Sequence, residues 1–167
     1  MHVQVHHPEL IPRRGEIIAW LLFAAILVTW LSLVMLSRPV HWGLPVLTVF
    51  LLLASLSISL GNWSDRNTHL GLDESGIAFT NGLRKVCLKW EEVREVRVHP
   101  AVWGKKVQVF GDKSYFDYHT LGEVKYQGEV KGRTGFMQGE AILQHILENS
   151  GLQVASQLGS VVYYARK

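Results

Sequence analysis

Two long stretches without a charged side chain constrain this 167-residue chain more than any other feature. The first runs from Ile17 to Ser37 and the second from Pro39 to Ser64. Each is at least as long as the roughly 20 residues with which an α-helix crosses the hydrocarbon core of a bilayer. The first also exceeds the roughly 7–15 apolar residues of a signal peptide. The sequence therefore predicts a transmembrane helical hairpin over residues 17–63, between an N-terminal tail (residues 1–16) and a soluble domain (residues 64–167).

The basic residues around the two spans predict how the hairpin is oriented. The loop between the spans holds only Arg38, whereas the flanking segments contain Arg13, Arg14, Arg66, Arg84, Lys85 and Lys89. By the positive-inside rule we expect a multi-pass protein of the inner membrane with both termini in the cytoplasm. Neither span carries an Asp, Glu, Lys or Arg, and His41 lies in the loop. This argues against an ion or proton path, and hence against a transporter or a channel.

After residue 64 the chain alternates between apolar and polar residues, which is typical of antiparallel strands. Asn81-Gly82 separates two such runs and predicts a hairpin turn in which both residues have positive φ. Pro100 ends a further run, and Gly111-Asp112 predicts another turn. We therefore expect six or seven short antiparallel strands in the soluble domain.

Near the C-terminus the apolar pattern changes to the period of an α-helix. Residues 136–149 place on one side of that helix Met137, Ala141, Ile142, Ile146 and Leu147. Gly151 follows as a C-terminal cap. The segment "SVVYYA" is one more possible strand, and the sequence does not place residues 152–167 in the fold.

Three segments of the soluble domain carry a family pattern: "LDESGIAFTNG", "VCLKWEEVREVRV" and "GEAILQHILE". They resemble the bacterial pleckstrin-homology-like (PH-like) domains, which are often found behind one or two transmembrane helices. The shared pattern is a glycine that opens a strand, a hairpin, a tryptophan, and hydrophobic residues three and six positions later. Here these structural anchors are Gly76, Trp90, Val93 and Val96. The resemblance covers residues 70–149.

The resemblance implies an α+β architecture: a transmembrane hairpin, then a bent antiparallel sheet of about seven strands capped by one C-terminal α-helix. It implies no particular activity, because one fold can host many functions. Phosphoinositide-binding relatives use basic residues in the loop between the first two strands. Here that loop contains Asp73 and Glu74, which would repel an inositol phosphate.

Three features could carry chemistry, and each has a plainer interpretation. Asp117 and His119 share one face of a strand and could serve a hydrolase or hold a metal, or that face could be solvated with Phe116 and Tyr118 turned inward. Cys87 could be a nucleophile or a buried small hydrophobe. The tail segment "HHPEL", with His2 nearby, could bind a metal, dock a partner or be a mobile tail. In each case the plainer interpretation is the one we adopt. We therefore predict no cofactor, no metal site and no catalytic residue.

The charged residues of the soluble domain bear on its partners. After residue 64 the chain has 14 basic and 12 acidic residues, and this near balance shows no basic stripe for nucleic acid. Some basic groups could still face anionic lipid, at about 1 kcal/mol per residue near the surface. The candidates are Arg84, Lys85, Lys89, Lys105 and Lys106. They could equally be lysines that protect strand edges.

We therefore expect a non-enzymatic, membrane-anchored binding protein whose PH-like domain engages a protein partner through a sheet edge, a loop or the helix flank. Sensing of anionic lipid is the first alternative, and a membrane-bound hydrolase that uses Asp117 and His119 is the second. The sequence does not identify the partner, the pathway or the oligomeric state.

Overall fold

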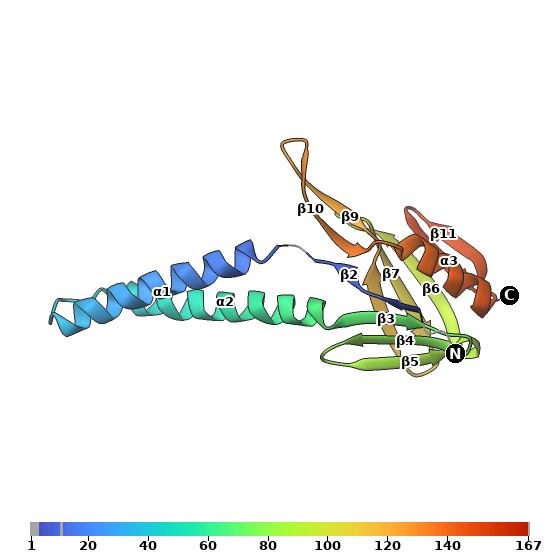
Figure 1. Cartoon of the computed structure of the whole chain (residues 1–167), viewed down its shortest axis with the longest axis horizontal. Coiled ribbons are helices and arrows are strands. Elements are labelled where there is room, and N and C mark those ends of the chain that lie inside the picture. The colour runs from blue at the N-terminus through green and yellow to red at the C-terminus, as the bar shows by residue number, and fades with distance from the viewer. Residues whose placement is uncertain (1–3, 11, 167) are drawn as a thin grey trace. The chain divides into compact units, whose positions relative to one another are not determined.

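The computed structural model describes residues 4–10 and 12–166, and these fall into two compact units (Figure 1). One unit comprises residues 12–64 and contains the helical hairpin. The other, which we call the C-terminal unit, combines the N-terminal residues up to position 11 with residues 65–167. The expected tail of residues 1–16 is thus divided, because residues 4–6 and 8–9 pair with later strands while a helix begins at Arg14.

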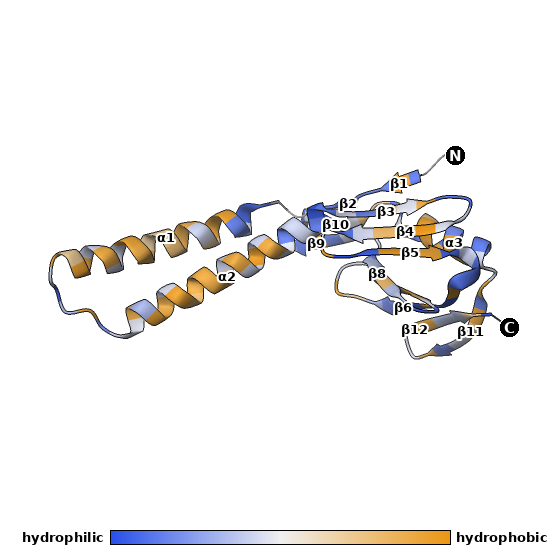
Figure 2. Ribbon diagram, turned by 90° about the horizontal axis from the view of Figure 1, so that it is seen from below, coloured by the Kyte–Doolittle hydropathy of each residue, from blue (hydrophilic) through white to orange (hydrophobic). Residues whose placement is uncertain are grey.

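The hairpin consists of α1 (Arg14–Met35) and α2 (Gly43–Arg66). By length and composition both helices are apolar enough to cross a membrane (Figure 2). Polar contacts near the open end of the hairpin join them. Trp20 Nε1 donates to Ser59 Oγ at 2.9 Å, and the carboxylate of Glu16 accepts from Ser59 Oγ and Asn62 Nδ2 at 2.8 Å each. These hydrogen bonds fix the pairing of two helices that are otherwise apolar.

The described residues of the C-terminal unit form three antiparallel sheets and one helix, which makes the chain an α+β protein. A four-stranded sheet has the order β1-β3-β4-β5 (Gln4–His6, Thr68–Leu72, Gly76–Asn81, Lys85–Lys89). A five-stranded sheet has the order β11-β12-β6-β7-β8 (Gln153–Leu158, Val161–Ala165, Val93–Pro100, Lys105–Gly111, Tyr115–His119). A three-stranded sheet has the order β2-β10-β9 (Pro8–Glu9, Glu129–Phe136, Gly122–Tyr126). The 3-10 turn η1 (Trp90–Glu92) joins the two larger sheets, and α3 (Gly139–Ser150) follows β10.

The hydrophobic core is built from alternate residues of these strands. In β7 and β8 the inward residues are buried and their neighbours face out, as the period of two requires. Phe116 of β8 stacks on Phe79 of β4 with ring centroids 5.0 Å apart, which links the two larger sheets. The helix α3 adds Ile142, Leu143 and Ile146 to the same core.

The first hairpin turn lies one residue later than the sequence predicts. Asn81 N–H donates to the Arg84 carbonyl at 3.2 Å, so Gly82 and Leu83 are the two central residues. Gly82 has φ +76°, whereas Asn81 keeps a negative φ and ends β4. A glycine at the first central position is the signature of a II′ turn. The Asn81 side chain instead caps the turn, because its Oδ1 accepts from the amides of Leu83 and Arg84.

The C-terminal helix begins later than the sequence predicts. Gly139 is its first residue, so Met137 lies outside it and is 62% exposed. Leu143 takes a place on the buried face that the sequence interpretation did not give it. Ile142 and Ile146 are buried as predicted, and Gly151 caps the helix with φ +67°.

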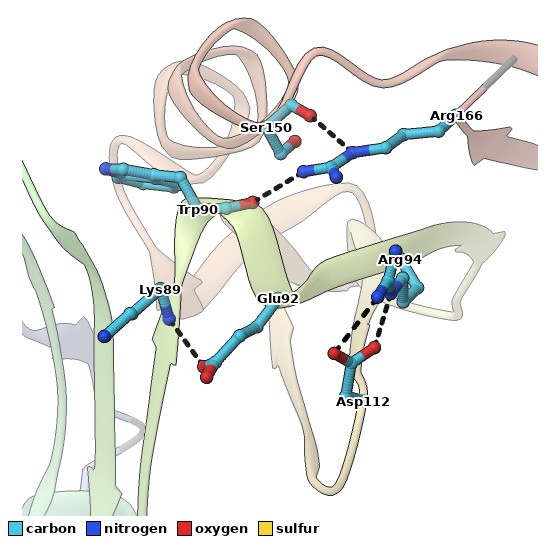
Figure 3. A network of polar contacts seen from close by, with 7 residues as sticks. All are labelled: Lys89, Trp90, Glu92, Arg94, Asp112, Ser150 and Arg166. Carbon is cyan, nitrogen blue, oxygen red and sulfur yellow. Dashed lines mark hydrogen bonds and ion pairs between the residues drawn. The ribbon is translucent and has the colours of Figure 1, made fainter.

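Residues after the helix form a hairpin that joins the five-stranded sheet. The possible strand "SVVYYA" corresponds to β12, which pairs with β6, and β11 pairs with β12 at the edge of that sheet. The side chain of Arg166 fixes the end of this hairpin, donating to the carbonyls of Trp90 (3.2 Å) and Ser150 (3.4 Å) (Figure 3). Close by, the guanidinium of Arg94 donates hydrogen bonds to the carboxylate of Asp112. This interaction lowers the pKa of the Asp112 carboxyl.

The strand count exceeds the prediction of about seven. Eight strands lie between residues 68 and 136, and residues 4–9 and 153–165 contribute four more. The extra strands are short or highly exposed: β1 has three residues, β2 has two, and every residue of β11 is exposed. Such segments bury too little apolar surface to show a strand pattern in the sequence.

Candidate binding surface

Five side chains form a continuous series of aromatic rings and guanidinium groups beside the outer face of the five-stranded sheet. We call them the aromatic–arginine ladder: Tyr163 (β12), Arg97 (β6), Phe110 (β7), Tyr115 (β8) and Arg84 (the β4–β5 turn). The guanidinium carbon of Arg97 lies 4.6 Å from the ring centroid of Phe110 and 5.7 Å from that of Tyr163. The rings of Phe110 and Tyr115 stack at 5.7 Å, and Arg84 lies 5.1 Å over Tyr115.

Strand register explains why the four ladder residues on strands share one face, and Arg84 joins them from its turn through its contact with Tyr115. Tyr163 pairs with Arg97 across β12 and β6, and Phe110 pairs with Tyr115 across β7 and β8. Each has an immediate neighbour in the core; Val109 and Phe116, for example, are fully buried. Because side chains alternate along a strand, burial of these neighbours turns the ladder outward. Large rings therefore stay partly in water, and Tyr115 is 49% exposed.

The Arg97 guanidinium is held in place before any partner arrives. Its Nε and Nη2 donate to the two carboxylate oxygens of Glu95 at 2.8 and 3.1 Å. This bidentate hydrogen bonding raises the pKa of Arg97, which stays charged. Fixed between two rings and a carboxylate, Arg97 presents a planar surface that loses little conformational entropy on binding.

Asp117 lies next to the ladder and forms ion pairs with two basic side chains. Its carboxylate oxygens lie 3.7 Å from Arg84 Nη2 and 3.1 Å from Lys106 Nζ. Phe116 and Tyr118 point into the core, so Asp117 and His119 share the outer face, as the plainer interpretation predicts. The Asp117 carboxylate thus forms two ion pairs, and its use with His119 as an acid–base pair stays an alternative hypothesis.

Four of the five predicted lipid-facing basic residues lie at two adjacent turns, and Lys89 lies apart from them at the other end of β5. Arg84 belongs to the ladder, and Lys106 pairs with Asp117. Lys105 lies 2.9 Å from a carboxylate oxygen of Glu140 at the start of α3. Lys85 and Lys89 are exposed on β5, which is an edge strand. Only the positions on β5 match the role of edge lysines that discourage unwanted strand pairing.

The four residues of the family pattern occupy structural positions. Gly76 is buried where an added Cβ would fall on the backbone of Leu88 in the adjacent strand, so only glycine fits there. Trp90 is 8% exposed and follows β5 directly, as expected. Val93 and Val96 are both fully buried. A register shift between Val93 and residue 95 places these two valines, three positions apart, on the same face.

The other candidate residues lie apart from the ladder. Cys87 is exposed on β5, so the expectation that it packs as a small hydrophobe is wrong. Within residues 4–10 and 12–166, no cluster of three or more His, Cys, Asp or Glu side chains could hold a metal. His2 lies outside the described residues. His6 and His7 line an open groove of about 490 Å³ with residues 136–138, and partial burial lowers the pKa of His6.

Comparisons with protein-family models, with curated proteins and with solved structures find no match for this chain. The surface must therefore be interpreted from its own residues. Sequence analysis missed Arg97, Phe110 and Tyr163 as surface residues. The available signal was the alternation itself: the valines at 96, 98, 107 and 109 assign Arg97, which lies between two of them, and Phe110, which follows Val109, to the opposite face.

Proposed function

We propose that this protein is a membrane-anchored binding protein of the bacterial PH-like type, and that its C-terminal unit engages a protein partner through the aromatic–arginine ladder. The ladder is the observation that carries the proposal. Tyr and Arg are enriched in protein–protein interfaces and among the residues that dominate binding energy. The rings are partly exposed, and Arg97 is already held in one conformation by Glu95. A partner that covers this surface would therefore lose little side-chain conformational entropy on binding.

Several features support the membrane anchor and the PH-like type. The hairpin supplies two helices long enough to span a bilayer. The pairing of β1 with β3 joins residues before α1 to residues after α2 in one folded unit, which favours both termini on one side of the membrane. The positions of Gly76, Trp90, Val93 and Val96 agree with their expected structural roles. On this proposal the protein is not an enzyme and acts at the inner membrane, with the C-terminal unit in the cytoplasm.

The test is affinity purification of the full chain in mild detergent, with bound proteins identified by mass spectrometry. The informative variant is Tyr115→Ala combined with Tyr163→Ala. Loss of a central interface residue typically costs about 2 kcal/mol, or roughly 30-fold in affinity. Tyr126→Ala is the matched control, because Tyr126 is 64% exposed on β9 and lies outside the ladder.

We expect a stoichiometric partner with the wild-type chain and with Tyr126→Ala, and its loss with the double variant. Equal recovery by all three chains would place the partner elsewhere on the molecule and refute the ladder as the binding surface. Recovery of no partner by the wild-type chain would refute protein binding itself.

A further inference from the structure

Two turns of the C-terminal unit share a pattern in which exposed apolar residues precede two basic ones. The β4–β5 turn is Gly82-Leu83-Arg84-Lys85, and Leu83 is 65% exposed. The β6–β7 loop continues from Val102-Trp103 through Gly104 to two lysines, with Val102 91% and Trp103 43% exposed. We call residues 82–85 and 101–106 together the junction end. Single exposed apolar residues are common on protein surfaces, so what matters here is that three of them lie beside four basic residues at one end of the unit.

The two turns are joined by ion pairs to one carboxylate, and the β6–β7 loop is held at its base by hydrogen bonds. Asp117 forms ion pairs with both Arg84 and Lys106, at 3.7 and 3.1 Å. The β6–β7 loop is fixed to Thr120, because Lys105 N–H donates to Thr120 Oγ1 and Thr120 N–H donates to the Lys105 carbonyl, both at 2.9 Å. Val102 therefore projects from an anchored loop and is directed into solvent by the fold.

The chain from α2 reaches the unit at this same end. Thr68 begins β3 and pairs with Asn81, the residue before the β4–β5 turn. Asp65 is close enough to His119 to interact with it electrostatically. His119 in turn pairs across the strands with Lys106 of the junction end. Connectivity thus brings the end of α2 to the two turns.

The segment before α1 leaves the unit at the junction end too. Glu9 pairs with Gly135, and Gly135 packs so closely on the Thr120 backbone that a Cβ there would overlap it. Thr120 also anchors the β6–β7 loop. Only residues 10–13 separate Glu9 from α1, and a segment of this length spans at most about 18 Å.

We propose that the junction end contacts the membrane in which the hairpin is embedded, with Leu83, Val102 and Trp103 seated in the bilayer interface. Trp favours the headgroup level, and small apolar side chains reach the acyl boundary. The basic residues behind each tip lie where anionic headgroups would attract them. This inference rests on the membrane anchor of the proposed function but not on a protein partner.

Spin-label accessibility in lipid nanodiscs tests this contact on the full chain. In a Cys87→Ser background, a nitroxide is attached to Val102→Cys, and in separate samples to Glu74→Cys or Lys113→Cys. The two control positions lie in the β3–β4 loop and the β7–β8 turn, at the opposite ends of the same strands. Collision rates with oxygen, which concentrates in lipid, and with a water-soluble nickel chelate are compared in neutral and in partly anionic bilayers.

We expect the label at position 102 to collide more with oxygen than with the nickel chelate, and the labels at 74 and 113 to show the reverse order. Equal nickel accessibility at all three positions would overturn the proposal. Protection of position 102 only in native membranes, and not in nanodiscs, would also overturn it and assign these side chains to a protein neighbour. Incorporation of the chain into nanodiscs tests the anchor separately, so failure of the anchor is distinguishable from failure of the contact.

Discussion

The side chain of Asp73 stabilises the loop in which it lies. From the sequence we expected this carboxylate only to repel an inositol phosphate. Its Oδ1 accepts three hydrogen bonds, from Ser75 N–H (2.7 Å), Ser75 Oγ (2.6 Å) and Gly76 N–H (2.8 Å). Its carbonyl accepts from the indole of Trp90 at 3.1 Å. The β3–β4 loop is therefore closed by Asp73 and locked to Trp90.

These bonds favour the charged carboxylate, so they hold the pKa of Asp73 below its usual value. A lowered folded-state pKa contributes stability that is present above the unfolded value near 3.8 and is lost as the pH falls through the folded value. We predict that Asp73→Asn, which keeps an acceptor oxygen, makes the unfolding midpoint less dependent on pH in this acid window. Thermal unfolding of the full chain in detergent at a series of pH values measures it.

The neighbouring substitution Glu74→Gln removes a negative charge but none of the three hydrogen bonds, so it is the matched control. If Asp73→Asn followed the wild-type acid dependence, the bonds to Ser75 and Gly76 would contribute nothing to stability in solution. Asp73→Ala, which lacks the acceptor, should lower the midpoint across the whole pH range.

Among the secondary-structure elements, the C-terminal hairpin is joined to two others by the side chain of Arg166. The strand β11 is exposed along its whole length and lies at the edge of the sheet, paired with β12. Arg166 ties the end of β12 to the carbonyls of Trp90 and Ser150, so it joins the hairpin to η1 and to the end of α3. Without this link, the hairpin would be held by its strand pairing with β6, by Val162 and Tyr164 against the core, and by the contact of Tyr163 with Arg97.

We predict that Arg166→Ala speeds hydrogen exchange of the β11 and β12 amides roughly fivefold, equivalent to about 1 kcal/mol for the lost hydrogen bonds. Exchange in β7 and β8 should not change. Arg133→Ala is the control, because Arg133 forms an exposed ion pair with Glu123 at 3.9 Å and lies on β10, outside the C-terminal hairpin. Exchange that is equally fast in both variants would show that Arg166 does not anchor the hairpin.

The elements differ in how far sequence could predict them. The two long helices, the hairpin turns and α3 depend on local sequence patterns. The predicted bounds of each differ from the observed bounds by a few residues. The strands β1 and β2 were missed because their partners lie far along the chain: Gln4 pairs with Leu72, and Glu9 with Gly135. The strand β11 was missed because all its residues are exposed, so it shows no alternation of buried and exposed positions. The ladder was missed because it combines residues from five separate elements that only strand register brings together.

For the whole molecule, the decisive observation is that residues on both sides of the hairpin fold together. Val5 pairs with Gly71, although α1 and α2 lie between them in the sequence. A chain that forms this pair cannot place its N-terminal tail and its C-terminal unit on opposite sides of a membrane. If the hairpin is the membrane anchor that we propose, it crosses twice, and the loop between the helices lies on the other side.

We predict that single cysteines at Val5 and Lys113, in a Cys87→Ser background, react identically with a membrane-impermeant maleimide, whereas Ser37→Cys in the loop reacts oppositely. With both termini in the cytoplasm, only position 37 should label in intact spheroplasts, and positions 5 and 113 should label after lysis. The reverse pattern would keep the hairpin but invert its orientation. Labelling of position 37 together with positions 5 and 113 would mean that the hairpin does not cross the membrane, and both the anchor and the proposed contact of Val102 with lipid would then fail.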